Sequence, residues 1–196
     1  MSEKCIAIIP ARAGSVRIPG KNMKPFHGKP IVQYSIEKAM ESCLFEKIVV
    51  SSDSLVTVGL ANQFGVDGQY RPKAFADAVT GTQAVARYVL QCNKGYDFAC
   101  VIYATAPMMS IKDLKQGLEL LKRDGRPYVY SVGPDWQDAG QFYWGDTMTF
   151  LRGVPLEDPM TAKMRIDASR VCDINTPEEW SRAEEMYTQG GFASEQ

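Results

Sequence analysis

The sequence predicts an α/β fold with a mainly parallel sheet, and three observations lead to that prediction. Three short segments are continuously apolar through their centres, as is typical of strands that helices cover on both faces. Segments with helical periodicity separate these strands. The length of 196 residues suits a single domain, taken here as residues 1–196. In folds of this kind, ligands bind at the carboxyl ends of the strands.

Five strands are predicted in chain order. The three continuously apolar segments are residues 5–9, 47–51 and 98–103. Residues 128–132 and 141–144 combine aromatic and β-branched side chains, which favours two further strands. Within the last of these, Tyr143 and Trp144 are expected in the core. Residues 145–168 show no clear period and are expected to be irregular.

Four helices are predicted, two of them from apolar residues that share one face: Val32, Ile36, Ala39, Met40 and Cys43 in the first, and Val85, Tyr88, Val89 and Cys92 in the second. The third helix begins at a capping box of Ser110 and Asp113. The fourth has the strongest start signal, because Thr176 is a good N-cap, Pro177 suits the first helical position and Glu179 completes a capping box.

Composition excludes several functions. Lys plus Arg is 22 against 23 for Asp plus Glu, so the net charge is −1 and there is no basic excess for a nucleic acid or an anionic membrane. His27 is the single histidine, which rules out a His-rich zinc site and requires any Ser–His or Cys–His pair to use it. His27 itself is expected in a loop.

Cysteine usage and hydropathy indicate the compartment. The five cysteines are an odd number without a C-x-x-C pair, so free thiols in a reducing cytoplasm are expected. No segment approaches the roughly 20 apolar residues that span a bilayer. We therefore expect a cytoplasmic protein with no membrane and no nucleic-acid partner.

The loop after the first strand carries the chemistry, with the sequence Pro10-Ala-Arg-Ala-Gly-Ser-Val-Arg-Ile-Pro-Gly-Lys-Asn22. Two glycines allow close backbone approach, and Arg12, Arg17 and Lys21 bring three cations together, which suits a polyphosphate. The spacing is not that of a Walker A loop, because one residue too many precedes Lys21 and Asn22 stands where Ser or Thr would bind magnesium. On composition alone, a basic surface loop remains the alternative.

The order of residues in this loop, Ile8-Ile-Pro-Ala-Arg-Ala-Gly-Ser15 and then Ile18-Pro-Gly-Lys-Asn22, resembles the signature of the acylneuraminate cytidylyltransferases. The resemblance continues in order through residues 28–31 (Gly-Lys-Pro-Ile), 51–53 (Ser-Ser-Asp), 71–72 (Arg-Pro), 80–82 (Thr-Gly-Thr), 103–107 (Tyr-Ala-Thr-Ala-Pro), 138–145 (Asp-Ala-Gly-Gln-Phe-Tyr-Trp-Gly) and 173–177 (Asp-Ile-Asn-Thr-Pro). Segments 103–107 and 138–144 look most like the pseudaminic acid branch.

The resemblance implies a three-layer, Rossmann-like nucleotide-diphospho-sugar transferase fold and a reaction. A hydroxyl of an acidic nine-carbon sugar attacks the α-phosphate of CTP, and pyrophosphate leaves. This chemistry needs charge neutralisation and in-line positioning more than covalent catalysis. The product is a CMP-activated nonulosonic, sialic acid-like sugar.

The resemblance also implies roles for individual residues. The catalytic residues are Arg12 and Lys21. The nucleotide is bound by Ala11, Arg12, Ala13, Gly14, Ser15, Lys21, Asn22, Arg71 and Thr82, and the sugar by Tyr103, Thr105 and Gln141. Mg²⁺ is held by Asp173 and Asn175, with Asp53 or Asp167 as a further carboxylate.

Three departures from the family pattern leave a second hypothesis open. Val16 stands where the family usually has lysine, and Asp173-Ile-Asn175 replaces an Asp-x-Asp metal motif. Residues 133–137 replace a long insertion that forms the family's dimer interface. The family-type homodimer is therefore not expected, and the alternative function is a catalytically silent nucleotide- or sugar-binding member of the family.

Overall fold

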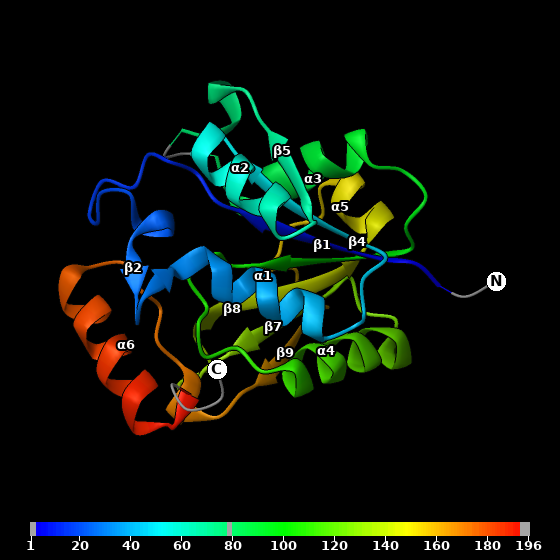
Figure 1. The fold of residues 1–196 in the computed structure, drawn as a ribbon. Coiled ribbons are helices and arrows are strands. Elements are labelled where there is room, and N and C mark those ends of the chain that lie inside the picture. The colour runs from blue at the N-terminus through cyan, green and yellow to red at the C-terminus, as the bar shows by residue number, and fades with distance from the viewer. Residues whose placement is uncertain (1–2, 78–79, 193–196) are drawn as a thin grey trace.

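The computed structural model describes residues 3–77 and 80–192, and its centre is a seven-stranded sheet of order β5-β4-β1-β6-β8-β7-β9 (Figure 1). The strands are β1 (Cys5–Pro10), β4 (Lys47–Ser52), β5 (Asp67–Tyr70), β6 (Phe98–Ile102), β7 (Tyr128–Val132), β8 (Asp138–Asp146) and β9 (Ala162–Arg165). Strand β8 pairs antiparallel with both β6 and β7, and the other strand pairs of this sheet are parallel. The predicted mainly parallel α/β sheet is confirmed.

Helices cover both faces of the sheet and make three layers. On one face lie α1 (Ile31–Glu41), α2 (Leu55–Gln63) and α4 (Ile111–Asp124), whose buried residues share a core cluster. Helices α3 (Thr82–Cys92) and α5 (Thr147–Arg152) pack on the other face. Helix α6 (Pro177–Gln189) stands beside a two-stranded ribbon of β2 (Pro25–Phe26) and β3 (Lys29–Pro30). Short 3₁₀ turns are η1 (Lys21–Met23), η2 (Lys73–Phe75) and η3 (Ala168–Arg170).

The five predicted strands and four predicted helices are all present. Tyr143 and Trp144 are buried in β8, as expected of core aromatics. The expectation of an irregular segment at residues 145–168 is wrong, because α5 and β9 lie there. These elements have six and four residues, which is too short for a periodic signal, and α5 depends on its cap, where Asp146 accepts from the N–H of Thr149 at 2.9 Å.

The two predicted capping boxes have different outcomes. At α6, Thr176 caps the N–H of Glu179, and the Glu179 carboxylate accepts from the N–H of Thr176 at 2.8 Å, so this box is confirmed. At α4, Ser110 caps the N–H of Asp113. The Asp113 carboxylate, however, is buried and pairs with Arg170 at 2.8 Å, so the second half of that box is wrong.

The connections of β1 and β6 leave room for a ligand-binding site at the carboxyl ends of these two strands. From β1 the chain builds β4 and β5 on one side through α1 and α2, and then crosses through α3 to β6 on the other side of β1. The loops that follow β1 and β6 therefore diverge at adjacent carboxyl ends, which is where open α/β sheets bind ligands. Parallel pairing of Ile8 with Val101 fixes the two strands against each other.

Helix α6 anchors the second wall of that site. Its Trp180 and Tyr187 pack edge-on against Phe26 at ring centroid distances of 5.5 and 5.4 Å. His27, in the turn of the β2–β3 ribbon, packs on Tyr187 at 4.9 Å and is a loop residue, as expected. Immediately before α6, Ile174 is fully buried in the same cluster. Of the residues on either side of it, Asp173 is exposed and Asn175 is half-buried.

Two further features concern the surface. Strands β7 and β8 are joined by a tight hairpin, in which Gly133 donates to Gln137 O at 2.9 Å and Trp136 has φ 65°.

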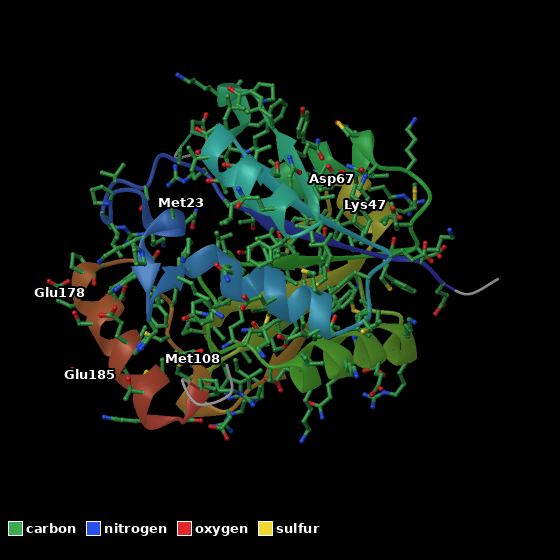
Figure 2. The ribbon with its side chains drawn as sticks, in the orientation of Figure 1. Met23, Lys47, Asp67, Met108, Glu178 and Glu185 are labelled. Atoms are coloured by element: carbon green, nitrogen blue, oxygen red, sulfur yellow. The ribbon has the colours of Figure 1, made fainter. Side chains whose placement is uncertain are left out.

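Strands β4 and β5 are joined at the surface by an ion pair of Lys47 and Asp67 at 2.7 Å (Figure 2). Within the described ranges, no helix has the length and apolarity needed to cross a membrane.

Candidate active site

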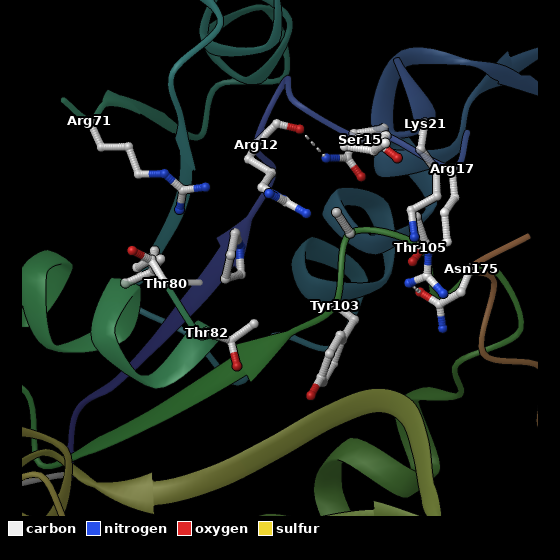
Figure 3. Close-up of a pocket in the computed structure, with 15 residues that line it drawn as sticks. Arg12, Ser15, Arg17, Lys21, Arg71, Thr80, Thr82, Tyr103, Thr105 and Asn175 are labelled. Carbon is white, nitrogen blue, oxygen red and sulfur yellow. Dashed lines mark hydrogen bonds between the residues drawn. The ribbon is translucent and has the colours of Figure 1, made fainter. Parts of the chain in front are cut away.

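A cavity of about 410 Å³ lies at the carboxyl ends of β1 and β6 (Figure 3). It is lined by Pro10, Arg12, Ser15, Val16, Arg17, Lys21, Asn22, Arg71, Thr80, Thr82, Val85, Tyr103, Ala104, Thr105 and Asn175. These residues come from the end of β1 and the loop after it, the loop after β5, the start of α3 with Thr80 just before it, the loop after β6 and the segment before α6. Nine of the fourteen predicted site residues line this cavity; Ala11, Ala13, Gly14, Gln141 and Asp173 do not.

Hydrogen bonds from neighbouring elements shape the loop after β1. The N–H of Ala13 donates to the Asp53 carboxylate at 2.8 Å, and the Asn22 amide donates to Arg12 O at 2.9 Å. Ala11 is fully buried, with its N–H bound to Ser51 O at 2.9 Å and its carbonyl accepting from Ser52 Oγ at 2.6 Å. Ala13 and Gly14 are exposed residues beyond this anchor, and the Ala13 carbonyl accepts from the N–H of Ser15 at 2.9 Å. Asp53 therefore fixes the loop.

Four cations line the cavity. Figure 3 shows Arg71, then Arg12, and then Lys21 with Arg17 across the view. Burial lowers the pKa of Lys21; Asp173 opposes this shift, and the neighbouring Arg17 and Arg12 add to it. Burial also lowers the pKa of Arg71; Asp53 opposes this shift, and Arg12 adds to it. Arg12 thus lowers the pKa of a cation on each side of it. Four positive charges in one cavity favour an anion with several phosphates.

The two ends of this row differ in burial. Arg71 is 2% exposed, and its Nε and Nη1 atoms have no hydrogen-bond partner among the described residues. An unsatisfied buried guanidinium is costly, and a ligand bound in the cavity would remove that cost. Lys21 donates to the carbonyl of Ile174 at 2.5 Å, which joins the loop after β1 to the segment before α6.

The predicted metal residues form a small polar network. The Asn175 amide donates to the Asp173 carboxylate at 2.5 Å, and Asn175 Oδ1 accepts from Arg17 Nη2 at 3.0 Å. Asp173 also packs against Gly140, where an added Cβ would lie 2.9 Å from Asp173 Oδ1. The described residues contain no group of three or more His, Cys, Asp or Glu side chains that could hold a metal ion.

Among the described residues, no hydrogen bond joins either predicted additional carboxylate to this network. The Asp53 carboxylate accepts from the Ala13 N–H, as described above. Asp167 caps the short turn at residues 168–170, where its carboxylate accepts from the N–H and the hydroxyl of Ser169. Those two hydrogen bonds lower the pKa of Asp167.

The side of the cavity predicted to bind the sugar is built from β6 and β8. The Tyr103 hydroxyl donates to the Asp138 carboxylate at 3.1 Å, and burial together with Asp138 raises the pKa of that tyrosine, so it stays protonated. The Tyr143 hydroxyl donates to Thr82 Oγ1 at 2.9 Å. Gln141 lies outside the lining, with its amide donating to Arg170 O at 2.6 Å.

Some residues at or near the cavity are not among the predicted site residues. Arg17 is predicted as a cation of the loop but not as a site residue, and it lines the cavity. Thr80 belongs to a family motif without a predicted role, and it lines the cavity as well. Asp138 opens a recognised motif, and only its bond to Tyr103 connects it to the cavity. A signal for Arg17 did exist, because it directly follows the valine that replaces the family's lysine.

Fold and cavity together define a class, that of Rossmann-like proteins with an anion-binding cavity where the strand order reverses. A family model described as Cytidylyltransferase matches residues 6–143, well over half of the sequence. The chain belongs to the cytidylyltransferase family and is by class a nucleotidyltransferase.

Three similar proteins indicate how far the likeness extends. Pseudaminic acid cytidylyltransferase of Campylobacter jejuni is 29% identical and aligns with 94% of this chain and 96% of its own length. The structure of CMP:2-keto-3-deoxy-manno-octonic acid synthetase complexed with CTP has a TM-score of 0.76 at 16% identity, covering 96% of this chain and all of that one. A manganese complex from Mycobacterium tuberculosis has a TM-score of 0.68 at 12% identity, covering 93% of this chain and 98% of that one. The two structures support the predicted Rossmann-like fold.

The Campylobacter alignment also contains the length difference that the motifs predict. It spans 223 positions, whereas 94% of 196 residues is about 184, so about 39 positions face no residue of this chain. The hairpin between β7 and β8 is five residues long, at residues 133–137, where the insertion was expected to be missing.

Proposed function

We propose that this cytidylyltransferase uses CTP to activate an acidic nine-carbon, nonulosonic sugar as its CMP-sugar, with release of pyrophosphate. The observation that carries the proposal is the row of four cations in the cavity at the ends of β1 and β6. A triphosphate is the anion that such a row suits best. Pseudaminic acid is the first sugar to test, because the relative similar over nearly the whole chain is named for it.

Different residues along the cavity would bind different parts of the substrates. Arg71 and Thr82 would bind the cytidine at the buried end. Arg12, Ser15, Lys21 and Asn22 would hold the phosphates, with the exposed residues Ala13 and Gly14 beside them. Arg12 and Lys21 would stabilise the charge that develops as the α-phosphate is transferred. Tyr103 and Thr105 would contact the sugar, while Gln141 would act from behind the cavity wall.

The donor set at the segment before α6 fits a magnesium ion bound mostly through the substrate. Asp173 supplies a carboxylate and Asn175 an amide oxygen, both hard oxygen ligands. Magnesium commonly takes one or two carboxylates together with substrate phosphates, so a larger acidic group is not required. When bound, the ion would neutralise phosphate charge; the chain's own contribution is to hold Asp173 against Gly140.

The test is pyrophosphate release from CTP, Mg²⁺ and a panel of nonulosonic acids headed by pseudaminic acid. We expect release that depends on both sugar and metal, with ATP and UTP inactive. Arg12→Gln should reduce kcat by about 100-fold or more, as removal of a charge-stabilising donor does elsewhere. Arg123→Gln removes the same charge from the exposed face of α4 and should leave kcat unchanged. Absence of release with every sugar counts against the proposal.

A silent nucleotide-binding protein is the second candidate, and one observation favours it. Position 175 supplies a neutral amide where the family motif has a carboxylate, and the amide is already bound to Arg17 and Asp173. Calorimetry with CTP separates the two functions, because a tight, metal-independent complex without pyrophosphate release favours the silent form.

Oligomeric state and compartment stay predictions. The five-residue hairpin leaves no insertion between β7 and β8, so we expect sedimentation to show no dimer of the family type. The cytoplasmic location is a prediction from cysteine usage.

A further inference from the structure

We infer that Arg170 and Asp113 form a positioning pair, which fixes the segment that carries Asp173 and so sets the position of the metal ligand. The inference deepens the proposed function and rests on it in taking Asp173 to hold the metal ion. It starts from the ion pair of Arg170 Nη2 with Asp113 Oδ2 at 2.8 Å, in which the Asp113 side chain is 7% exposed and that of Arg170 is 22% exposed. Neither is among the described residues that line the cavity, so both act through other residues.

The pair joins two separate walls of the cavity. Arg170 ends the short turn η3 and lies three positions before Asp173. Asp113 is in the first turn of α4, which follows the loop after β6 that carries Thr105. Figure 3 shows Thr105 and Asn175 on the same side of the cavity. The contact of Arg170 with Asp113 therefore holds the segment before α6 against the element that ends the loop after β6.

A second contact fixes the main chain of the same segment. Gln141 of β8 is buried, and its amide donates to Arg170 O at 2.6 Å. The neighbouring Gly140 packs against Asp173, where an added Cβ would lie 2.9 Å from Asp173 Oδ1. The side chain and the carbonyl of Arg170 are thus held by two different elements, α4 and β8. Two fixed points leave little freedom to the backbone that leads to Asp173.

Stability alone does not explain the pair. A buried ion pair commonly stabilises a protein no more than apolar residues of similar volume, because the desolvation of two charges offsets their attraction. Arg170 Nε is also buried without a hydrogen-bond partner among the described residues. The Asp113 carboxylate pairs with Arg170 rather than completing the capping box of α4. What the two charges supply, and apolar contacts do not, is one defined position of the two segments relative to each other.

The experiment compares the affinity of the full chain for CTP in Mg²⁺ and in EDTA, by calorimetry. The wild type should bind CTP more tightly in Mg²⁺. Arg170→Met should weaken binding in Mg²⁺ by about 10-fold, the usual effect of losing a residue that orients a metal ligand. In EDTA it should change binding by less than about twofold, since the residues that line the cavity are unaltered.

Two further variants serve as controls for that substitution. Arg170→Lys should keep most of the Mg²⁺-dependent affinity, because the contact with Asp113 uses a single nitrogen rather than the planar fork of arginine. Arg123→Met makes the same change as Arg170→Met on the exposed face of α4 and should alter neither affinity. Unchanged CTP affinity of Arg170→Met in Mg²⁺ would overturn the inference.

An apolar replacement of the whole pair separates positioning from stability. Arg170→Met alone leaves the Asp113 charge buried and unpaired, so its urea midpoint should fall. The double variant Asp113→Leu/Arg170→Met removes both charges and should regain the wild-type midpoint. Its CTP affinity in Mg²⁺ should nevertheless stay about 10-fold below that of the wild type. If this affinity recovers together with the midpoint, the pair is only structural and the inference is wrong.

A core variant of the same helix tests whether lost stability by itself weakens metal binding. Leu121→Ala removes a buried side chain of α4 and should lower the urea midpoint, while CTP affinity in Mg²⁺ stays that of the wild type. An equal loss of that affinity in Leu121→Ala and Arg170→Met would contradict a positioning role.

This readout is independent of turnover. If CTP binding depends on Mg²⁺ and on Arg170, and no sugar yields pyrophosphate, the inference holds and the proposed function fails. If the wild type makes a CMP-sugar and Arg170→Met binds CTP normally in Mg²⁺, the inference alone fails. A wild type that binds CTP equally well in Mg²⁺ and in EDTA also overturns the inference.

Discussion

Arg71 and Arg17 lie at the two ends of one cavity, and their surroundings differ. Arg71 is almost fully buried. Near it, Thr82 lines the same cavity and accepts a hydrogen bond from the buried Tyr143. Arg17 is exposed and is oriented by Asn175. A buried end recognises its ligand by shape and by satisfying fixed donors, whereas an exposed end recognises charge and is screened by salt. The two ends should therefore respond differently to the same kind of mutation.

The largest expected effect is at the buried end. Arg71→Met should weaken CTP binding about 10- to 100-fold, because a charged group with unsatisfied donors is lost. The same change should raise the free energy of unfolding by about 1–3 kcal/mol, since the cost of burying those donors disappears. Calorimetry with CTP and urea unfolding give the two values.

Arg17→Met is the matched change at the exposed end. Its free energy of unfolding should stay within about 0.5 kcal/mol of the wild type, as for other surface substitutions. The expected difference between the two ends is wrong if Arg71→Met has the lower free energy of unfolding of the two variants.

The next effect is a pH dependence that comes from Lys21. Its pKa lies below the ordinary 10.5, chiefly through burial, so it loses its proton in the folded protein before it would in the unfolded chain. Between the lowered pKa of Lys21 in the folded protein and the ordinary 10.5, the free energy of unfolding should increase as the pH rises, because the unfolded state binds more protons in that pH window. Pyrophosphate affinity should fall by about 10-fold over the same window as the site loses a charge.

Lys21→Arg is the control for this dependence. Arginine keeps its charge throughout that pH range, so the alkaline loss of pyrophosphate affinity should disappear. An equal alkaline loss in wild type and Lys21→Arg assigns the titration to another group.

A smaller effect is expected at Gly140, a buried residue of β8 that packs against Asp173. Its φ is 64°, and an added Cβ would lie 2.9 Å from Asp173 Oδ1. Gly140→Ala should cost about 1–2 kcal/mol of stability for the left-handed backbone and should also displace Asp173. Gly125→Ala at the end of α4 has a similar φ of 57° and open space around it. Both variants should lose stability, and Gly140→Ala alone should require more Mg²⁺ for activity.

The smallest effect tests the hydroxyl pair at the buried end. Tyr143→Phe removes the bond to Thr82 Oγ1 and should cost about 1 kcal/mol of stability. A double-mutant cycle with Thr82→Val should show coupling of about 0.5–1.5 kcal/mol. Additive losses mean that Thr82 is not positioned by Tyr143.

Much of the fold could be predicted from local signals, and the failures have physical causes. The capping box of Thr176 and Glu179 is a local interaction, so sequence spacing is enough to identify it. Asp113 fits the same spacing, yet its carboxylate pairs with Arg170, 57 positions away along the chain, and such a long-range ion pair leaves no local pattern. Strand β9 lies at a sheet edge and is half-exposed, so its four residues carry no apolar run.

In the candidate site, too, contacts between residues far apart in the sequence could not be predicted. Arg12, Lys21 and Arg71 could be found because the order of residues around them is distinctive. The contact of Arg17 with Asn175 joins residues 158 positions apart, and the bond from Tyr103 to Asp138 depends on the pairing of β6 with β8. Gln141 belongs to a recognised motif, but its side chain turns to Arg170 behind the cavity wall.

The two outer strands of the sheet have a consequence for solubility. Strand β5 and strand β9 are each only four residues long and end the sheet on opposite sides. Asp67 on the first, and Lys163 and Arg165 on the second, place charges along the unpaired edges. Short, charged edges are poor templates for another chain's strand, so the make-up of these two strands disfavours edge-to-edge aggregation.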